Sequence, residues 1–232
     1  MVWSDTAAGD GAPVYPMIGL VPRVSFTLIL VLLITGCVHT RPFTDVDGHT
    51  IPGSVATMEF ATTGGVPQSL WFRGLSRSNP ALILLHADPS TSESALFRYY
   101  NSELEHHFLV VYWEQRGTGR SFSSAIPPQT MTITQFVSDL DEVVELVRRR
   151  FGKDKVVLPA HSWGTVLGTI YASRYPEKVS AYVGVAQIAN VPQGRQLSYE
   201  FALSEAKKRN NAKAVSELMA IGPPPMTQSM KS

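Results

Sequence analysis

The chain has 232 residues, which is enough for one domain with a substantial core. Its 20 basic and 19 acidic residues leave a formal net charge of +1 at pH 7, which excludes the strong positive field typical of nucleic-acid-binding proteins, so no nucleic-acid partner is predicted. Charged residues make up 17% of the chain, below the roughly 25% of an average soluble domain, and few of them lie in the first forty positions.

The N-terminal segment contains an apolar run at residues 24–36, which is shorter than the roughly 20 residues that span a bilayer but typical of a signal-peptide core. The stretch LITGC (33–37) resembles a bacterial lipobox, in which the cysteine is lipidated, and Cys37 is the only cysteine of the chain. Residues 1–37 are therefore predicted to be an N-terminal extension and lipoprotein signal peptide. This predicts an exported protein, anchored to a membrane of the bacterial cell envelope by a lipid on Cys37.

Two alternatives stay open for this segment. Residues 1–22 contain Asp5 and Asp10 but no Lys or Arg, unlike the positively charged start of a signal peptide, so Met17 is an alternative start of translation. A buried hydrophobic helix with an incidental cysteine is the other interpretation.

Residues 38–54 are rich in Thr, Asp, Gly and Pro without periodicity, which predicts a tether. Two β-prone runs, 58–62 and 69–75, are separated by TGGVPQ and predict an antiparallel hairpin. The continuous apolar run 80–86 is typical of a strand that is covered on both faces.

Helices and strands then alternate, which predicts an α/β core over residues 55–190 with a mainly parallel sheet. A long helix is marked by the capping-box spacing of Thr132 and Gln135 and ends before Gly152. Residues 191–232 are predicted to begin a helical cap, with two short amphipathic helices separated near Asn210 and Asn211 and no strand after them. The other predicted elements are helices at 94–104 and 164–174 and strands at 107–113, 155–160 and 179–189.

Three motifs carry the functional signal. AHSWG (160–164) lies between a predicted strand and a predicted helix, the context in which a G-x-S-x-G turn presents a serine nucleophile. HADPS (86–90) and EQRGTGRS (114–121) each follow a predicted parallel strand, where open α/β sheets bind their ligands.

Together these motifs resemble the α/β-hydrolase fold, and within it the prolyl aminopeptidase (proline iminopeptidase) branch, which typically shows HGGPG, WDQRGxGxS and GxSWG in this order. The resemblance covers about residues 55–221. It implies a serine hydrolase that acts on small peptides or amides through an acyl-enzyme on Ser162. It also implies that the backbone N–H groups of Trp163 and Asp88 form the oxyanion hole, and it implies no metal or organic cofactor.

The chain departs from the family pattern at two places. HADPS places Ala87 where glycine is expected and brings the carboxylate of Asp88 close to a site for negative charge. Glu114 replaces aspartate at a position that we expect to order its turn.

The histidines of the chain are not expected to include the catalytic base. The resemblance makes His86 a structural residue of the oxyanion loop, and His161 should point away from the reaction. Active catalysis with a base supplied by His86 or in trans is a third hypothesis. His106 and His107 are predicted to be solvated, with no third metal ligand evident.

The expected acid and base of a triad are missing from the sequence. In α/β-hydrolases they follow the serine in the order Asp or Glu, then His, but this sequence has no histidine after His161 and no aspartate after Asp154. We expect a C-terminally truncated hydrolase that lacks its last strands and whose sheet ends in an exposed edge. The alternative is a non-catalytic, lipid-anchored binding protein that reuses the hydrolase pocket. The remaining acidic candidates are better explained as helix-surface charges: Glu177, Glu200, Glu205 and Glu217.

Overall fold

The structure is a computed structural model that describes residues 40–224. The predicted signal peptide and Cys37 lie outside the described residues. Among residues 40–224, no helix has both the length and the apolar character needed to cross a membrane.

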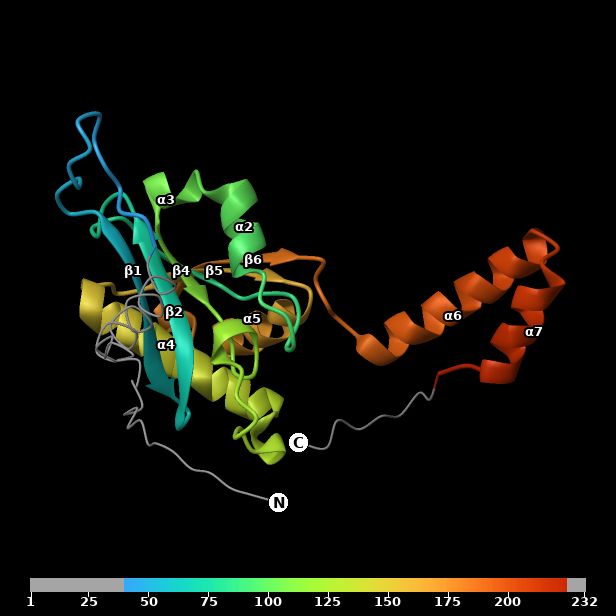
Figure 1. Cartoon of the computed structure of the whole chain (residues 1–232). Helices are drawn as coiled ribbons and strands as arrows, with labels where there is room; N and C mark the ends of the chain where they lie inside the picture. The colour runs from blue at the N-terminus through green and yellow to red at the C-terminus, as the bar shows by residue number, and fades with distance from the viewer. Residues whose placement is uncertain (1–39, 225–232) are drawn as a thin grey trace, which may run out of the picture. The chain divides into compact units, whose positions relative to one another are not determined.

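A six-stranded sheet forms the centre of the fold, with the strand order β1-β2-β4-β3-β5-β6 (Figure 1). The β1–β2 and β2–β4 pairs are antiparallel, whereas β4–β3, β3–β5 and β5–β6 are parallel. The predicted α/β class, mainly parallel sheet and N-terminal hairpin are therefore confirmed. The strands are β1 (Val55–Thr63), β2 (Val66–Gly74), β3 (Ala81–Leu84), β4 (Leu109–Trp113), β5 (Val156–His161) and β6 (Val179–Val185).

The hairpin turn is shorter than the six residues predicted from TGGVPQ. It consists of Gly64 and Gly65, which both have positive φ angles, 53° and 77°, as the tightest hairpin turns require. Since Val66 already pairs with Thr63, the segment after the glycines continues the ladder.

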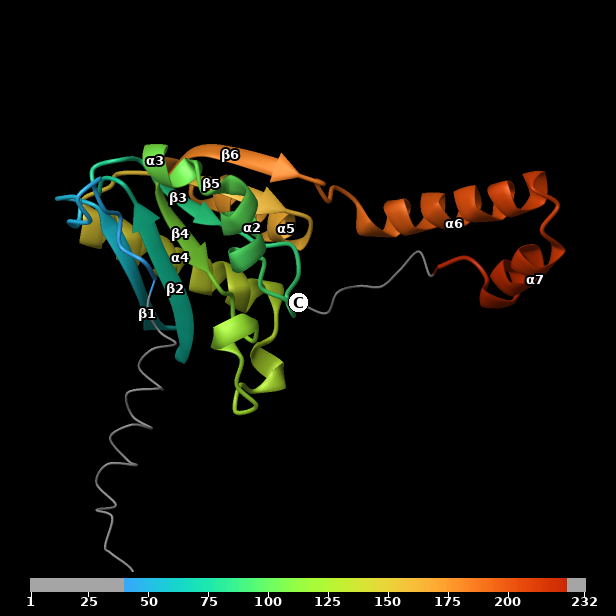
Figure 2. The ribbon, with the colours of Figure 1, turned by 45° about the horizontal axis from the view of Figure 1, so that its top comes forward.

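Helices cover both faces of the sheet (Figures 1 and 2). The main core lies between the sheet and the helices α4 (Ile133–Phe151) and α5 (Trp163–Arg174), and a smaller cluster on the opposite face includes Leu84, Tyr112 and Phe97 of α2 (Ser94–Asn101). β3 and β4 are buried along their whole length because both of their faces are covered. The remaining short elements are α3 (Leu104–His107), η2 (Gly119–Ser121), η3 (Pro128–Thr130) and η4 (Pro176–Lys178).

The long helix α4 begins and ends as its sequence predicts. The Thr132 hydroxyl accepts the Gln135 N–H at 3.2 Å, and Gly152 has the left-handed conformation that commonly follows a helix. Because its apolar residues repeat at helical spacing, one side of α4 is buried against the sheet.

Three predicted boundaries were wrong. The helix predicted at 94–104 breaks after Asn101, and His107 ends α3 instead of starting β4. The last strand stops at Val185, so residues 186–189 of the predicted strand belong to the loop before Val191.

The C-terminal part forms a helical hairpin of α6 (Val191–Lys208) and α7 (Ala212–Ile221), separated at Asn210 and Asn211 as predicted. The Tyr199 hydroxyl of α6 donates to the Leu218 carbonyl of α7 at 3.2 Å. At 18 residues, α6 is longer than the short helix predicted.

Part of the predicted tether contacts the sheet. The Arg73 guanidinium donates to the Thr40 hydroxyl and, at 2.7 Å, to the Arg41 carbonyl, and it lies over the Phe43 ring at 4.6 Å. These contacts fix the beginning of the described chain against β2.

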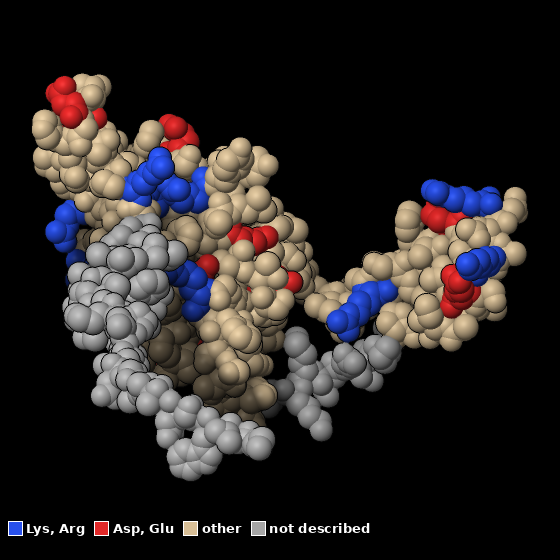
Figure 3. All heavy atoms as spheres, in the orientation of Figure 1, with Lys and Arg blue, Asp and Glu red and all other residues tan. Residues whose placement is uncertain are grey.

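On the face shown in Figure 3, basic and acidic side chains lie in small, separate groups among uncharged residues. This distribution agrees with the nearly balanced charge of the chain.

Candidate active site

Ser162 lies at the sharp turn between β5 and α5, as the AHSWG motif predicts. Its φ of 46° and ψ of −111° are strained for a residue with a Cβ atom. The Ser162 N–H donates to the Val185 carbonyl of β6 at 2.9 Å, and the Ser162 carbonyl accepts the Thr165 N–H at 2.9 Å. Because α5 starts at the next residue, the positive end of its dipole lies beside Ser162 and favours negative charge there.

The final glycine of the motif is required by close packing. A Cβ atom on Gly164 would lie 2.7 Å from the Leu85 carbonyl carbon and 2.9 Å from the His86 carbonyl oxygen. Since these are backbone atoms, no side-chain adjustment would relieve the clash. Gly164 therefore lets the start of α5 approach the end of β3.

The loop after β3 closes over the nucleophile turn. The Trp163 N–H, which the resemblance makes an oxyanion donor, donates to the Ala87 carbonyl at 3.1 Å. In this conformation the Trp163 N–H is hydrogen-bonded to the Ala87 carbonyl oxygen and is therefore not available to an oxyanion. The oxyanion role of Trp163 and Asp88 stays a prediction.

The carboxylate of Asp88 makes its hydrogen bonds within its own loop. Its carboxylate accepts the Ser90 hydroxyl at 2.5 Å and the Ser90 N–H at 2.6 Å. These hydrogen bonds lower the pKa of Asp88 below its usual range, so the carboxylate stays ionised.

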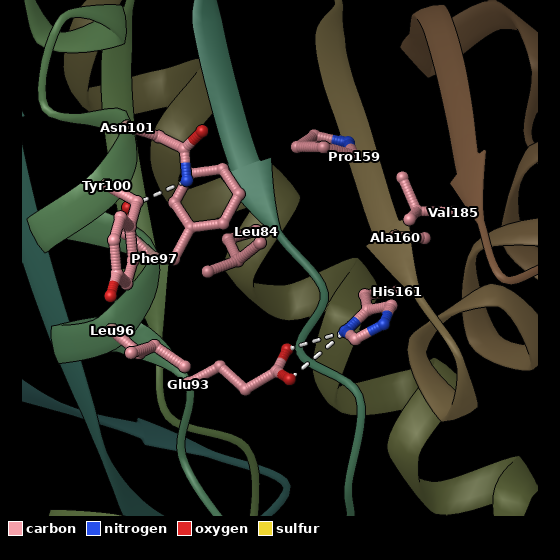
Figure 4. Close-up of a pocket in the computed structure, with 10 residues that line it drawn as sticks. All are labelled: Leu84, Glu93, Leu96, Phe97, Tyr100, Asn101, Pro159, Ala160, His161 and Val185. Atoms are coloured by element: carbon pink, nitrogen blue, oxygen red, sulfur yellow. Dashed lines mark hydrogen bonds and ion pairs between the residues drawn. The ribbon is translucent and has the colours of Figure 1, made fainter.

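Glu93, which the sequence did not single out, connects this loop to β5 (Figure 4). Its Oε2 accepts the Ala87 N–H at 2.9 Å, and its Oε1 lies 3.0 Å from Nδ1 of His161. No motif contains Glu93, which sits in the serine-rich stretch STSES (90–94).

Glu93 and His161 also line a cavity of about 360 Å³ on the α2 side of the sheet. Figure 4 shows both side chains at one end of this cavity, which has a largely apolar wall. The other lining residues are Leu84, Leu96, Phe97, Tyr100, Asn101, Pro159, Ala160 and Val185.

His86 is fully buried at the end of β3, and burial lowers its pKa from the usual 6.5 to about 4. Its Nε2 accepts the Gln115 N–H at 3.1 Å. In the neutral ring the hydrogen must then be on Nδ1, so neither nitrogen has a free lone pair for a serine proton. This geometry favours the structural role and argues against His86 as a base.

His161 pairs with Glu93 instead of with the serine. Among the described residues, the Ser162 hydroxyl makes no hydrogen bond to either histidine. The part of the chain that the structure describes therefore places no base in contact with Ser162 Oγ.

Residues of the EQRGTGRS motif order the loop after β4 and contact α5 and α4 next to the site. Glu114 accepts the Arg120 N–H at 2.8 Å and thus orders its turn as expected, and the Gln115 side chain accepts the Trp163 indole N–H at 3.3 Å. Arg116 forms a fully buried ion pair with Asp139 of α4.

Potential metal ligands lie away from Ser162 in the sequence. Asp45, Asp47 and His49 are exposed and have ligand atoms within 4.8 Å of one another. Two backbone N–H groups of this turn donate to the Asp45 carboxylate, which explains the cluster without an ion. His106 and His107 lie next to Glu103 on the surface.

Comparisons with known proteins agree with the motifs. The sequence profile of the alpha/beta hydrolase fold matches residues 80–214, more than half of the chain. The probable aminopeptidase YbaC of Bacillus subtilis is 33% identical over 180 residues, which are 77% of this chain and 56% of that protein. The proline iminopeptidase of Saccharolobus solfataricus is 32% identical over 116 residues, which are 50% of this chain and 36% of that protein.

Among solved structures, a proline iminopeptidase-related protein of Thermus thermophilus superposes with a TM-score of 0.54 at 26% identity, covering 69% of this chain and 59% of that one. The chain thus spans about half the length, or less, of the curated relatives described above.

Proposed function

Because this chain belongs to the α/β-hydrolase fold family, we propose that it is the core of a serine hydrolase in which Ser162 is the nucleophile. The observation that carries the proposal is the strained Ser162 backbone between a buried strand and a helix N-terminus. A turn of this kind exposes a serine hydroxyl to substrate, and backbone strain of this size is concentrated at active sites.

The substrate class follows from the relatives. They include a probable aminopeptidase and several proline iminopeptidases, so we propose that the chain acts on small peptides or amides. Ser162 Oγ would bond to the carbonyl carbon while its proton passes to a base. The C–N bond then breaks, the amine leaves with that proton, and water hydrolyses the acyl ester to release the acid and free Ser162.

Activation of Ser162 is a separate question. The sequence contains no histidine after His161, and the geometry of His86 and His161 argues against both as bases. We therefore propose that the 232-residue polypeptide presents Ser162 without activating it. Compared with a complete triad, its turnover should be lower by a factor on the order of 10⁴ to 10⁶.

The proposal is tested by labelling the folded polypeptide with a fluorophosphonate probe across a series of imidazole concentrations, imidazole serving as an external base. We expect slow labelling that rises in proportion to imidazole and disappears in Ser162→Ala. The matched control is Ser123→Ala, since Ser123 is exposed in a loop and should not affect the rate.

Each other outcome has a definite meaning. Labelling that persists in Ser162→Ala excludes Ser162 as the nucleophile. Fast labelling without imidazole means that an internal base exists. A folded protein that is never labelled is the behaviour of the alternative, a non-catalytic binding protein.

A further inference from the structure

Three hydrogen bonds form a continuous link around the nucleophile turn. The Trp163 N–H donates to the Ala87 carbonyl at 3.1 Å, the Ala87 N–H donates to Glu93 Oε2 at 2.9 Å, and Glu93 Oε1 lies 3.0 Å from His161 Nδ1. The link joins Ala87 in the loop after β3, the residue before α2, and both neighbours of Ser162. Figure 4 shows the Glu93 side chain extended toward His161.

In this arrangement the oxyanion site is closed. The Trp163 N–H is already engaged, and the Ala87 oxygen lies where negative charge would develop on a bound substrate. A carbonyl dipole in that position repels an oxyanion instead of stabilising it. The Ala87–Asp88 peptide must therefore turn before Ser162 can react efficiently.

Ala87 belongs to two peptide groups, one shared with His86 and one shared with Asp88, and only the Ala87–Asp88 group needs to turn. Rotation about ψ of Ala87 and φ of Asp88 would move the Ala87 carbonyl away from Trp163 and bring the Asp88 N–H into its place. The preceding peptide carries the N–H that Glu93 holds, and this peptide can stay fixed. Glu93 thus anchors the loop at the point about which it turns.

We propose that Glu93 is a positioning residue for the hydrolysis proposed above: it holds the loop after β3 against the nucleophile turn while the Ala87–Asp88 peptide turns to open the oxyanion site. This inference rests on the proposed function of Ser162. The Glu93 side chain is only 24% exposed, and its Oε2 accepts the Ala87 N–H at 2.9 Å.

The first arm of the test measures hydrogen exchange at the Trp163 amide, which reports on the loop contact without any reaction of Ser162. The chain has four tryptophans, so labelling with ¹⁵N-tryptophan gives few backbone amide signals, and Trp163→Phe identifies the one from Trp163. In the unmodified protein we expect slow hydrogen exchange at this amide. Glu93→Ala should speed the exchange about tenfold or more, the effect of losing a hydrogen bond to a charged group.

Glu93→Gln is the conservative variant. Its amide oxygen can still accept the Ala87 N–H, so most of the exchange protection should return. Glu103→Ala is the matched control, because Glu103 is nearby in sequence but 78% exposed, and within residues 40–224 it forms ion pairs with the surface residues His106 and His107. All variants are compared by circular dichroism and thermal unfolding to confirm that they fold.

The second arm measures labelling of Ser162 by the fluorophosphonate at fixed imidazole. We expect Glu93→Ala to be slower by about tenfold and Glu93→Gln to keep most of the rate. A folded Glu93→Ala that exchanges at Trp163 and reacts at Ser162 like the unmodified protein overturns the proposal. If Ser162 is unreactive in every variant, the proposed function fails, while the exchange arm still decides whether Glu93 holds the loop.

Discussion

Ser162 has a backbone conformation that costs about 1–3 kcal/mol for a residue with a Cβ atom. Glycine relieves this strain but loses about 0.5–1 kcal/mol through its greater freedom in the unfolded chain. We therefore predict that Ser162→Gly has a free energy of unfolding about 1 kcal/mol higher than Ser162→Ala, as measured by urea denaturation. Both variants lack the hydroxyl, so the comparison isolates the backbone. Equal stabilities would mean that the turn stores no strain.

His86 predicts a pH dependence of stability. Burial lowers its pKa to about 4, whereas in the unfolded chain the ring has its usual value of 6.5. The contribution of His86 to the free energy of unfolding is therefore complete above pH 6.5. It is lost as the pH falls toward 4, because only the unfolded state gains the proton in this range. The loss should be about 3 kcal/mol.

The pH prediction is measured as the free energy of unfolding between pH 4 and pH 7.5. His86→Gln keeps an acceptor for the Gln115 N–H but does not titrate, so its stability should fall less over this range. Parallel curves for the two proteins would contradict the burial of a neutral ring.

At the same scale, motif spacing predicted the position of Ser162 between a strand and a helix and the structural role of Glu114, whereas the nucleophilic role of Ser162 stays a prediction. It could not predict the contact between the Trp163 N–H and the Ala87 carbonyl, because the orientation of one peptide depends on the packing of two distant loops. Glu93 was missed for the same reason. A single acidic residue in a serine-rich stretch carries no periodicity or spacing that indicates a partner 68 residues away.

Between elements, the buried pair of Arg116 and Asp139 connects the loop after β4 to α4. Both side chains are 0% exposed, and Asp139 also accepts the Gln68 side chain at 2.7 Å. We predict that Asp139→Ala lowers the free energy of unfolding by about 3–5 kcal/mol, because it leaves the Arg116 charge buried without a partner.

Guanidinium denaturation measures this loss. The control is Glu217→Ala in α7, where the side chain is 64% exposed and its pair with Lys213 should contribute less than about 0.5 kcal/mol. A loss below about 1 kcal/mol in Asp139→Ala would show that solvent or another group replaces the carboxylate.

The strands and helices with strong periodicity were predicted well, and the errors have a tertiary cause. The helix predicted at 94–104 is interrupted because Glu105 must face the buried Arg73 guanidinium, which it accepts at 2.8 Å. Tyr112 of β4 donates to the same carboxylate at 2.9 Å. Local propensity contains no information about these partners, so it could not set the boundary between α3 and β4.

At the scale of the whole sheet, β6 is the outermost parallel strand among the described residues, and within them it pairs on one side with β5. Val183 and Val185 of this strand are 50% and 53% exposed. This agrees with the exposed hydrophobic edge expected from the sequence. An edge of this kind favours association between chains at high concentration.

We propose that a lipid on Cys37, which lies outside the described residues, attaches the molecule to a membrane. Lipidation would add acyl chains whose burial stabilises membrane binding by about 0.8 kcal/mol per CH₂, and more than one chain is needed for a stable anchor. Expressed with its N-terminal segment in a bacterium that processes lipoproteins, the chain should partition into the detergent phase of Triton X-114. The mass of the mature protein should correspond to a polypeptide that begins at a lipidated Cys37.

Cys37→Ser distinguishes a lipid anchor from the apolar run at 24–36. If a lipid on Cys37 holds the protein at the membrane, this variant cannot receive it and should lack the mass of the acyl chains. Where the uncleaved apolar run is the anchor, Cys37→Ser and the unmodified chain should both partition into detergent with the mass of the full precursor. An unmodified chain found in the aqueous phase would contradict both forms of attachment.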